Sequence, residues 1–260
     1  AFLGRSCPVD KRNLWGLYRA ISKFVEGIPF NKLTLRPTRA RVRGAGGAMF
    51  FAPVVIRPLL RSWLVRAPRS RFVVPPDGRL DTSGLSTYLY GHNPERAPYR
   101  NPPTFVVNCP VPCEFVVRVG EVSGTAILGV FVDGRLALRR EFPGSGRRHP
   151  GPKERVVKVP LPPGRHEVRV DNLGSDWIWV SWFALTRYVD ASRHPPLDVR
   201  CLRSPGLVLL WARNALSSPA LAELGAGPRP VSATVEVEGV RDGAYEVEFW
   251  DTWRGRVTRR

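Results

Sequence analysis

The clearest indication of the fold in this 260-residue sequence is the stretch Arg165-His-Glu-Val-Arg-Val-Asp-Asn-Leu-Gly-Ser-Asp-Trp-Ile-Trp-Val-Ser-Trp182. It holds a strand candidate, His166–Asp171, then a polar turn, and then the start of a longer apolar strand, Trp177–Tyr188. Apolar side chains lie on both faces of the longer strand, with Ile178, Val180, Trp182 and Ala184 on one and Trp177, Trp179, Phe183 and Leu185 on the other. Because such a strand is covered on both sides, the stretch predicts the centre of a β-sandwich.

The neighbouring sequence supplies further strands of this sandwich. Asp133-Gly134 is a type I′ hairpin signal, and a second strand pair is expected across Pro162-Pro-Gly164. Strand candidates occur at 71–74, 87–90, 104–108, 126–132, 135–142, 155–161 and 166–171. The 26 Pro and 24 Gly favour short strands over long helices, so we predict a sandwich over residues 71–189.

The remaining sequence predicts one helix and a second group of strands. Between an N-cap at Asp10 and a stop at Gly27, an apolar stripe of helical spacing comprises Leu14, Leu17, Tyr18, Ile21, Phe24 and Val25. Strand candidates occur at 33–42, 49–56, 197–203, 207–214, 232–240, 245–250 and 256–259. The C-terminal strands are too few for a sandwich of their own, so those before residue 57 are expected to complete it. The predicted fold is mainly β, with two jelly-roll-like β-sandwiches, the inner one inserted between residues 28–70 and 190–260 of the outer one.

A further strand is predicted in the C-terminal run Asp242-Gly-Ala-Tyr-Glu-Val-Glu-Phe-Trp-Asp-Thr-Trp-Arg-Gly-Arg256. Its side chains point alternately to the two faces before a Trp-Asp-Thr-Trp turn. It is similar to a strand in the small β-sandwich that closes many TIM-barrel glycoside hydrolases. The predicted helix and its exit, Phe30-Asn-Lys-Leu-Thr-Leu-Arg-Pro37, resemble the last helix of those barrels. The resemblance implies that residues 1–27 are the last helix of a barrel and that the chain is the C-terminal, non-catalytic part of a cellulase-like enzyme. The alternative is a helix that packs on a sandwich flank.

The loop of the opening stretch carries a pattern of its own, Val170-x-Asn172-x-Gly174-x-Asp176-Trp177. It resembles the final hairpin of galactose-binding-like jelly rolls, the fold of many carbohydrate-binding modules. Sugar rings stack on exposed Trp or Tyr, and their hydroxyls bond to Asp, Asn and Arg. The candidate carbohydrate-binding residues are Tyr88, Tyr90, Tyr99, Arg100, Asn172, Asp176 and Trp177. The alternatives stay open that the aromatic residues only pack and that Asn172 and Asp176 only shape the turn.

No catalytic residue is identified. Glycoside hydrolysis needs two carboxylates, one on either side of a sugar bond. The glutamates at alternating strand positions are instead typical of a solvated sheet face, and they are Glu236, Glu238, Glu246 and Glu248. Ser145 lacks the strand–turn–helix context of a nucleophile elbow. In the resembling hydrolases the acid and the nucleophile lie on barrel strands, which here would precede residue 1. We therefore expect catalysis to belong to another part of the protein.

The cysteines indicate no cofactor site. Cys109-Pro-Val-Pro-Cys113 is the one close pair among four cysteines, and it lacks the repeated spacing of a zinc site. The Cys109/Cys113 pair is interpreted as two free, half-buried thiols or as a local disulfide. No cofactor is expected, and the sequence leaves open whether a structural Ca²⁺ ion is bound. No apolar stretch approaches the roughly 18 residues of a membrane span.

The charge favours an anionic partner, since 40 Lys and Arg against 22 Asp and Glu give a net charge of +18. The bases are scattered and match no nucleic-acid-binding signature, which disfavours nucleic acid. We expect a non-catalytic accessory region that braces a catalytic barrel of the same polypeptide and holds polysaccharide or oligosaccharide near it. Such work implies an extracellular or periplasmic location. The alternatives are a structural β-sandwich spacer without a ligand and a basic module for anionic glycans or nucleic acid.

Overall fold

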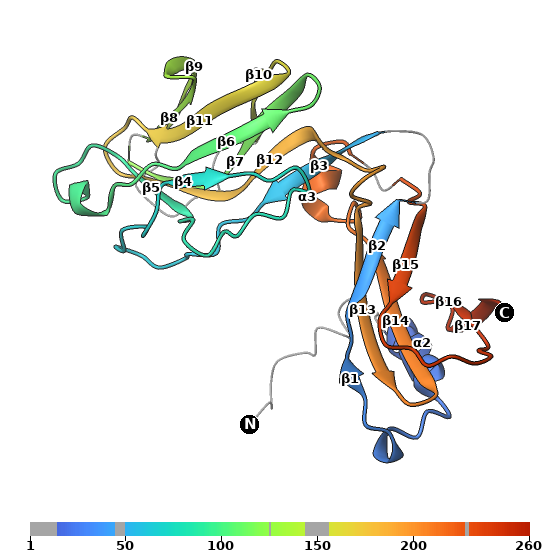
Figure 1. Cartoon of the computed structure of the whole chain (residues 1–260). Coiled ribbons are helices and arrows are strands. Elements are labelled where there is room, and N and C mark those ends of the chain that lie inside the picture. Colours follow the sequence, from blue (N-terminus) through green and yellow to red (C-terminus); the bar gives the residue numbers. More distant parts are fainter. Residues whose placement is uncertain (1–14, 45–49, 125, 144–155, 227–228) are drawn as a thin grey trace, which may run out of the picture. The chain divides into compact units, whose positions relative to one another are not determined.

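The computed structural model describes residues 15–44, 50–124, 126–143, 156–226 and 229–260, and the chain is mainly β (Figure 1). The expected helix start at Asp10 and the loop around Ser145 lie outside these residues. The chain divides into two compact units, which are described separately. The first comprises Ala1–Ala40, Val199–Trp211 and Val237–Arg260, and the second comprises Arg41–Asp198 and Ala212–Glu236.

A two-sheet β-sandwich makes up most of the second unit. The strands of one sheet are β3 (Phe51–Ile56), β5 (Tyr88–Tyr90), β7 (Cys113–Ser123), β10 (Val156–Leu161) and β12 (Trp177–Asp190). The strands of the other are β4 (Arg71–Val73), β6 (Thr104–Cys109), β8 (Ala126–Val132), β9 (Arg135–Phe142) and β11 (Gly164–Asn172). The first sheet runs β10–β7–β12–β3, with β5 also paired to β12, and the second runs β4–β6–β11–β8–β9. The mainly β fold with a sandwich is therefore confirmed.

The core of the sandwich joins the two sheets through aromatic side chains. The ring centroid of Phe105, on β6, lies 4.9 Å from that of Phe183, on β12, and 5.3 Å from that of Phe115, on β7. All three side chains are fully buried. Because β6 lies in one sheet and β7 and β12 in the other, this triplet ties the layers together by apolar burial.

Strand β12 is central, as predicted, but its faces differ from the predicted ones. It pairs with β7 on one side and with β3 and β5 on the other. Register shifts at Trp179/Val180 and Val180/Trp182 interrupt the alternation, as a β-bulge does. As a result Val180 and Phe183 both face the main core, whereas Trp182 packs on the opposite face against Ala220 of α3 (Pro219–Glu223).

Strand β3 belongs to the inner sandwich, which corrects the predicted boundary at residue 70. It pairs antiparallel with β12, with Val54 opposite Leu185. Its alternate residues Ala52, Val54 and Ile56 are buried in the sandwich core. This apolar face fits beside β12, so the strand lies with residues 71–189 rather than with the C-terminal strands.

The two predicted strand pairs have different outcomes. The Asp133-Gly134 hairpin is confirmed, because both residues have positive φ (50° and 80°) and β8 pairs with β9. The pair across Pro162-Pro-Gly164 is wrong, because β10 pairs with β7 in one sheet and β11 with β6 and β8 in the other. Prolines cannot donate to a strand ladder, and this connection forms an arch between the layers instead.

The first unit contains most of a three-stranded sheet together with a helix and a hairpin. Its elements are α2 (Trp15–Val25), β1 (Arg36–Pro37), β13 (Leu197–Ser204), β14 (Leu207–Asn214), β16 (Phe249–Asp251) and β17 (Arg256–Arg259). The sheet order is β1–β13–β14, and β16 pairs with β17. Helix α2 packs on this hairpin, where the Phe24 and Trp250 rings meet edge to face at 5.4 Å.

The remaining elements are short. They are the 3-10 turns η1 (Phe30–Lys32) and η2 (Ala97–Tyr99), and the paired strands β2 (Ala40–Gly44) and β15 (Ala233–Val237). The strand expected at 245–250 is reduced to β16, and Tyr245 and Val247 are exposed. An alternating apolar and polar pattern alone does not form a strand here, because no described element covers the side chains of Tyr245 and Val247. With β3 assigned to the inner sandwich, an outer sandwich built from the rest of 28–70 and from 190–260 stays a prediction, as does a barrel helix over 1–27.

The turn between β16 and β17 requires glycine at position 255. Gly255 has φ +61°, and a Cβ on it would lie 2.7 Å from Cα of Ala20 in α2. We expect Gly255→Ala to lower the free energy of unfolding of this unit by about 1–3 kcal/mol, because it adds left-handed strain and a helix clash. The matched control is Gly206→Ala, which has φ +80° but open space around it. Equal losses in urea unfolding of the two variants would contradict the helix contact.

Candidate functional site

Aromatic side chains gather on the face of β5 and β12 that points away from the sandwich core. In the β5–β12 pair, Trp177 lies opposite Tyr90 and Trp179 opposite Tyr88. The residue between them on β12, Ile178, is fully buried in the core, so the rings occupy the outer face. The rings in mutual contact here are Trp63, Tyr88, Tyr90, Tyr99 and Trp177, and we call them the ring cluster.

Trp63 lies at the centre of the ring cluster. Its ring centroid is 5.0 Å from that of Tyr88, 5.5 Å from that of Trp177 and 5.7 Å from that of Tyr90. The contacts with Tyr88 and Trp177 are edge to face, the favourable arrangement for aromatic pairs. Trp63 nevertheless remains 41% exposed. The cluster therefore holds one large ring in a fixed position at the protein surface.

The sequence-predicted aromatic residues are brought together, and one aromatic residue was missed. Tyr88, Tyr90 and Trp177 are in contact, and Tyr99 joins them through Tyr90 at 5.8 Å between centroids. Trp63 lies in the polar, Pro- and Arg-rich passage 57–70, where no periodicity predicts a strand or helix. The signal that was available is a single aromatic residue in an Arg- and Pro-rich segment.

Tyr90 holds the segment that carries Trp63. Its side chain is buried, and its hydroxyl oxygen accepts a hydrogen bond of 2.8 Å from the backbone N–H of Leu64. Leu64 has φ +54°, an uncommon conformation for leucine. Burial raises the pKa of the Tyr90 hydroxyl. Tyr90 is therefore a positioning residue, and it presents Trp63 rather than offering its own ring to a ligand.

A cation and a carboxylate border the ring cluster. The Arg96 guanidinium carbon lies 5.4 Å from the centroid of the Trp63 ring, within the range of a cation–π contact. Arg96 Nε lies 3.5 Å from Asp176 Oδ1, and Asp176 Oδ2 accepts a hydrogen bond of 2.7 Å from Ser123 Oγ. Asp176 thus fixes Arg96 beside the tryptophan ring.

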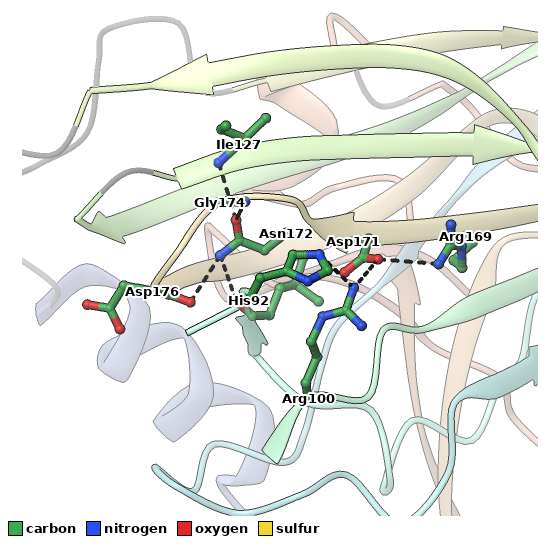
Figure 2. A network of polar contacts seen from close by, with 9 residues as sticks. His92, Arg100, Ile127, Arg169, Asp171, Asn172, Gly174 and Asp176 are labelled. Carbon is green, nitrogen blue, oxygen red and sulfur yellow. Dashed lines mark hydrogen bonds and ion pairs between the residues drawn. The ribbon is translucent and has the colours of Figure 1, made fainter. Parts of the chain in front are cut away.

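The Asn172 side chain bonds to backbone groups of its own loop and of the neighbouring strands β5 and β8 (Figure 2). Its Oδ1 accepts hydrogen bonds from the backbone N–H groups of Ile127 (3.2 Å) and Gly174 (2.9 Å). Its Nδ2 donates to the carbonyl oxygens of Leu89 (3.2 Å) and Asp176 (3.1 Å). The side chain is fully buried, so Asn172 shapes the loop that leads to Trp177 and is not exposed to a ligand.

Arg100 forms an ion pair with the buried carboxylate of Asp171, which was not among the predicted site residues (Figure 2). Arg100 Nη2 donates to Asp171 Oδ2 at 2.6 Å, and Arg169 Nη1 donates to the same oxygen at 3.3 Å. Asp171 is buried at the end of β11. His92 Nε2 lies 3.4 Å from Arg100 Nη2. Of the seven predicted residues, Arg100 and Asn172 therefore stabilise the sandwich end from within.

The ring cluster and its border offer a partly exposed indole, two neighbouring ring edges and a guanidinium, all held by contacts within the sandwich. Within the described ranges, no group of three or more His, Cys, Asp and Glu side chains is placed to hold a metal ion. Among the described helices, none has the length and apolar character needed to cross a membrane.

No protein-family model and no curated protein matches this sequence. Among solved structures, a family 35 carbohydrate binding module from Clostridium thermocellum aligns at 12% identity over 54% of this chain and 98% of that one, with a TM-score of 0.29. CBM35 from Paenibacillus barcinonensis aligns at 14% identity over 59% and 98%, with a TM-score of 0.28. The GH26-CBM35 β-(1,4)-mannanase of Podospora anserina aligns at 12% identity over 63% and 30%, also with a TM-score of 0.28. With TM-scores below 0.5, these similarities establish neither a shared fold nor a shared ligand.

Proposed function

We propose that the sandwich binds a carbohydrate chain at the ring cluster, with Trp63 as the main contact. The observation that carries this proposal is a tryptophan that is 41% exposed yet braced edge to face by Tyr88 and Trp177. A ring that is already immobilised loses little conformational entropy when a ligand stacks on it. The apolar C–H face of a sugar ring suits the exposed part of such a ring, and the Arg96 guanidinium, which lies over the Trp63 ring, can donate hydrogen bonds to hydroxyls.

The wider proposal is a non-catalytic accessory region of a glycoside hydrolase, outside the cell or in the periplasm. Helix α2 presents an exposed apolar face of Trp15, Tyr18 and Ile21, which suits a surface that packs against a catalytic barrel. Binding at the ring cluster would then keep polysaccharide near the barrel and raise its effective concentration. In a parent hydrolase, Trp63→Ala should slow turnover of an insoluble polysaccharide while turnover of a soluble oligosaccharide stays unchanged. Equal slowing of both would contradict the tethering role.

We expect Trp63→Ala to weaken carbohydrate binding by about 30-fold or more. A buried or clamped tryptophan at the centre of a binding surface contributes about 2 kcal/mol or more when truncated. Affinity is measured by titration calorimetry with the oligosaccharide that the unchanged protein binds most tightly. The matched control is Trp253→Ala, because Trp253 is 76% exposed and lies in the other unit. Unchanged affinity in the Trp63 variant, with a native circular dichroism spectrum, would overturn the assignment.

A second candidate function is a structural spacer without a ligand. It is favoured by the internal engagement of Asn172, Asp176 and Arg100, three of the polar residues that sugar hydroxyls would need. In a structural spacer, the ring cluster only holds the segment around Trp63 in place. The Trp63→Ala variant would then lose stability, and the unchanged protein would bind no member of a polysaccharide panel.

A further inference from the structure

Two cysteines flank the short arch that carries the chain from one sheet of the sandwich to the other. Cys109 ends β6 and Cys113 begins β7, with Pro110, Val111 and Pro112 between them. Strand β6 lies in one sheet and β7 in the other. Both side chains are buried in the core, and their Sγ atoms are 3.0 Å apart. The arch therefore points the two thiols at each other in the space between the layers.

The backbone around the arch is fixed from both sides. Cys109 is the strand partner of Gly164, and Cys113 is the strand partner of Leu161. These partners are the two ends of the neighbouring arch, which crosses between the same sheets. Within the cysteine arch, the two proline rings hold φ near −65° at their positions. Strand pairing and proline together restrict the separation of the two cysteine backbones.

We propose that Cys109 and Cys113 form a disulfide that links the two sheets of the sandwich. The two sulfur atoms of a disulfide are about 2.0 Å apart, so a side-chain rotation that shortens the Sγ–Sγ distance by about 1 Å allows the bond to form. This inference is independent of carbohydrate binding, because the arch contains no residue of the ring cluster. The cross-link adds a second covalent connection at the place where the backbone of the arch already joins the two sheets.

The oxidant is a low-molecular-weight disulfide of the glutathione type. The Cys109 thiolate attacks one sulfur of this disulfide and releases one thiolate. The Cys113 thiol loses its proton, attacks Sγ of Cys109 and releases the second thiolate. Two protein thiols thus lose two protons and two electrons, and the small disulfide is reduced to two thiols.

The surroundings assign the attacking role to Cys109. The hydrogen bond from the Cys113 thiol lowers the pKa of Cys109, and the nearby His166 acts in the same direction. His166 is itself held by Asp133, whose carboxylate lies 2.8 Å from His166 Nδ1 and raises the pKa of that imidazole. The same thiol hydrogen bond raises the pKa of Cys113. Thiolate character, which governs attack on a disulfide, is therefore concentrated on Cys109.

The test is mass spectrometry of the full chain after incubation in glutathione buffers of increasing oxidised fraction. One sample stays native, and a second is reoxidised while it refolds from urea, so that access to the buried thiols is not limiting. Free thiols are then blocked with N-ethylmaleimide. Trypsin cuts after Arg100 and Arg118, so both cysteines fall in the single peptide 101–118. We expect this peptide to carry no label and to be lighter by two hydrogens, and to take up two labels after reduction with dithiothreitol.

A matched variant isolates the first half of the reaction. In Cys113→Ser the second attack is impossible, so Cys109 should accumulate as a mixed disulfide with glutathione. The proposal is overturned if peptide 101–118 of the unchanged protein still carries two labels at the most oxidising ratio in both samples. A peptide with two glutathione adducts would overturn it equally, because it would mean that the two sulfurs do not reach each other.

Discussion

Replacing Asn172 by alanine is expected to lower the free energy of unfolding of the sandwich by about 3–5 kcal/mol. The fully buried amide serves four backbone groups, accepting from Ile127 and Gly174 and donating to Leu89 and Asp176. Alanine removes the acceptor of the Ile127 and Gly174 N–H groups and one donor to the Leu89 and Asp176 carbonyl oxygens, where water has little access. The Asp176 carbonyl oxygen keeps a hydrogen bond from the Gly91 N–H. Each unsatisfied buried group costs about 1–3 kcal/mol, and relaxation of the loop recovers part of the sum.

Urea unfolding followed by circular dichroism measures this loss. Asn172→Asp should be about as harmful, because a carboxylate cannot donate to the carbonyls of Leu89 and Asp176 and its charge would be buried. The matched control is Asn108→Ala on β6, whose side chain is exposed, and it should change stability by less than about 0.5 kcal/mol. A loss below about 1 kcal/mol for Asn172→Ala would show that this amide does not organise the loop.

The Arg100–Asp171 ion pair should give the second large effect. Arg100→Met is expected to cost about 3 kcal/mol, because it leaves the buried Asp171 carboxylate with only the longer contact to Arg169. We take the lower end of the usual range because the Arg100 side chain is partly exposed. Asp171 Oδ1 has no hydrogen-bond partner within the described structure, so no second bond to that oxygen compensates.

A double variant separates two contributions to the free energy of unfolding: the loss from leaving the Asp171 charge unpaired, and the stabilisation by the ion pair itself. Removing both partners in Arg100→Met/Asp171→Leu should restore part of the stability that Arg100→Met loses, because an apolar pair of similar size needs no counter-charge. Stability is measured by urea unfolding of both variants and the unchanged protein. If the double variant is less stable than Arg100→Met, Asp171 contributes through contacts other than this pair.

Much of the sandwich could be predicted because its signals are local. The apolar run Trp177–Tyr188 predicts a central strand, and Asp133-Gly134 predicts a hairpin. The errors arise where partners distant in sequence decide the outcome. A β-bulge at Val180 changes which residues share a face of β12, and the Pro162 connection joins two sheets instead of two paired strands. Neither is visible in periodicity, because side-chain spacing does not report which strand lies alongside.

The candidate site was predicted in its aromatic part and less so in its polar part. Tyr88 and Tyr90 alternate around a buried leucine, which correctly places two rings on one outer face. Trp63 could not be placed, because its position follows from the hydrogen bond between Leu64 and Tyr90. For Asn172, sequence reasoning left ligand binding and turn shaping open, and burial favours turn shaping.

The most direct test of carbohydrate binding is a binding assay of the full chain against soluble and insoluble polysaccharides at low and high salt. Stacking on Trp63 is not screened by ions, whereas attraction by a protein of net charge +18 is. We predict binding to at least one polysaccharide that persists at high salt and is lost in Trp63→Ala. Binding that disappears at high salt for every polysaccharide, or no binding at all, would contradict a carbohydrate site at the ring cluster.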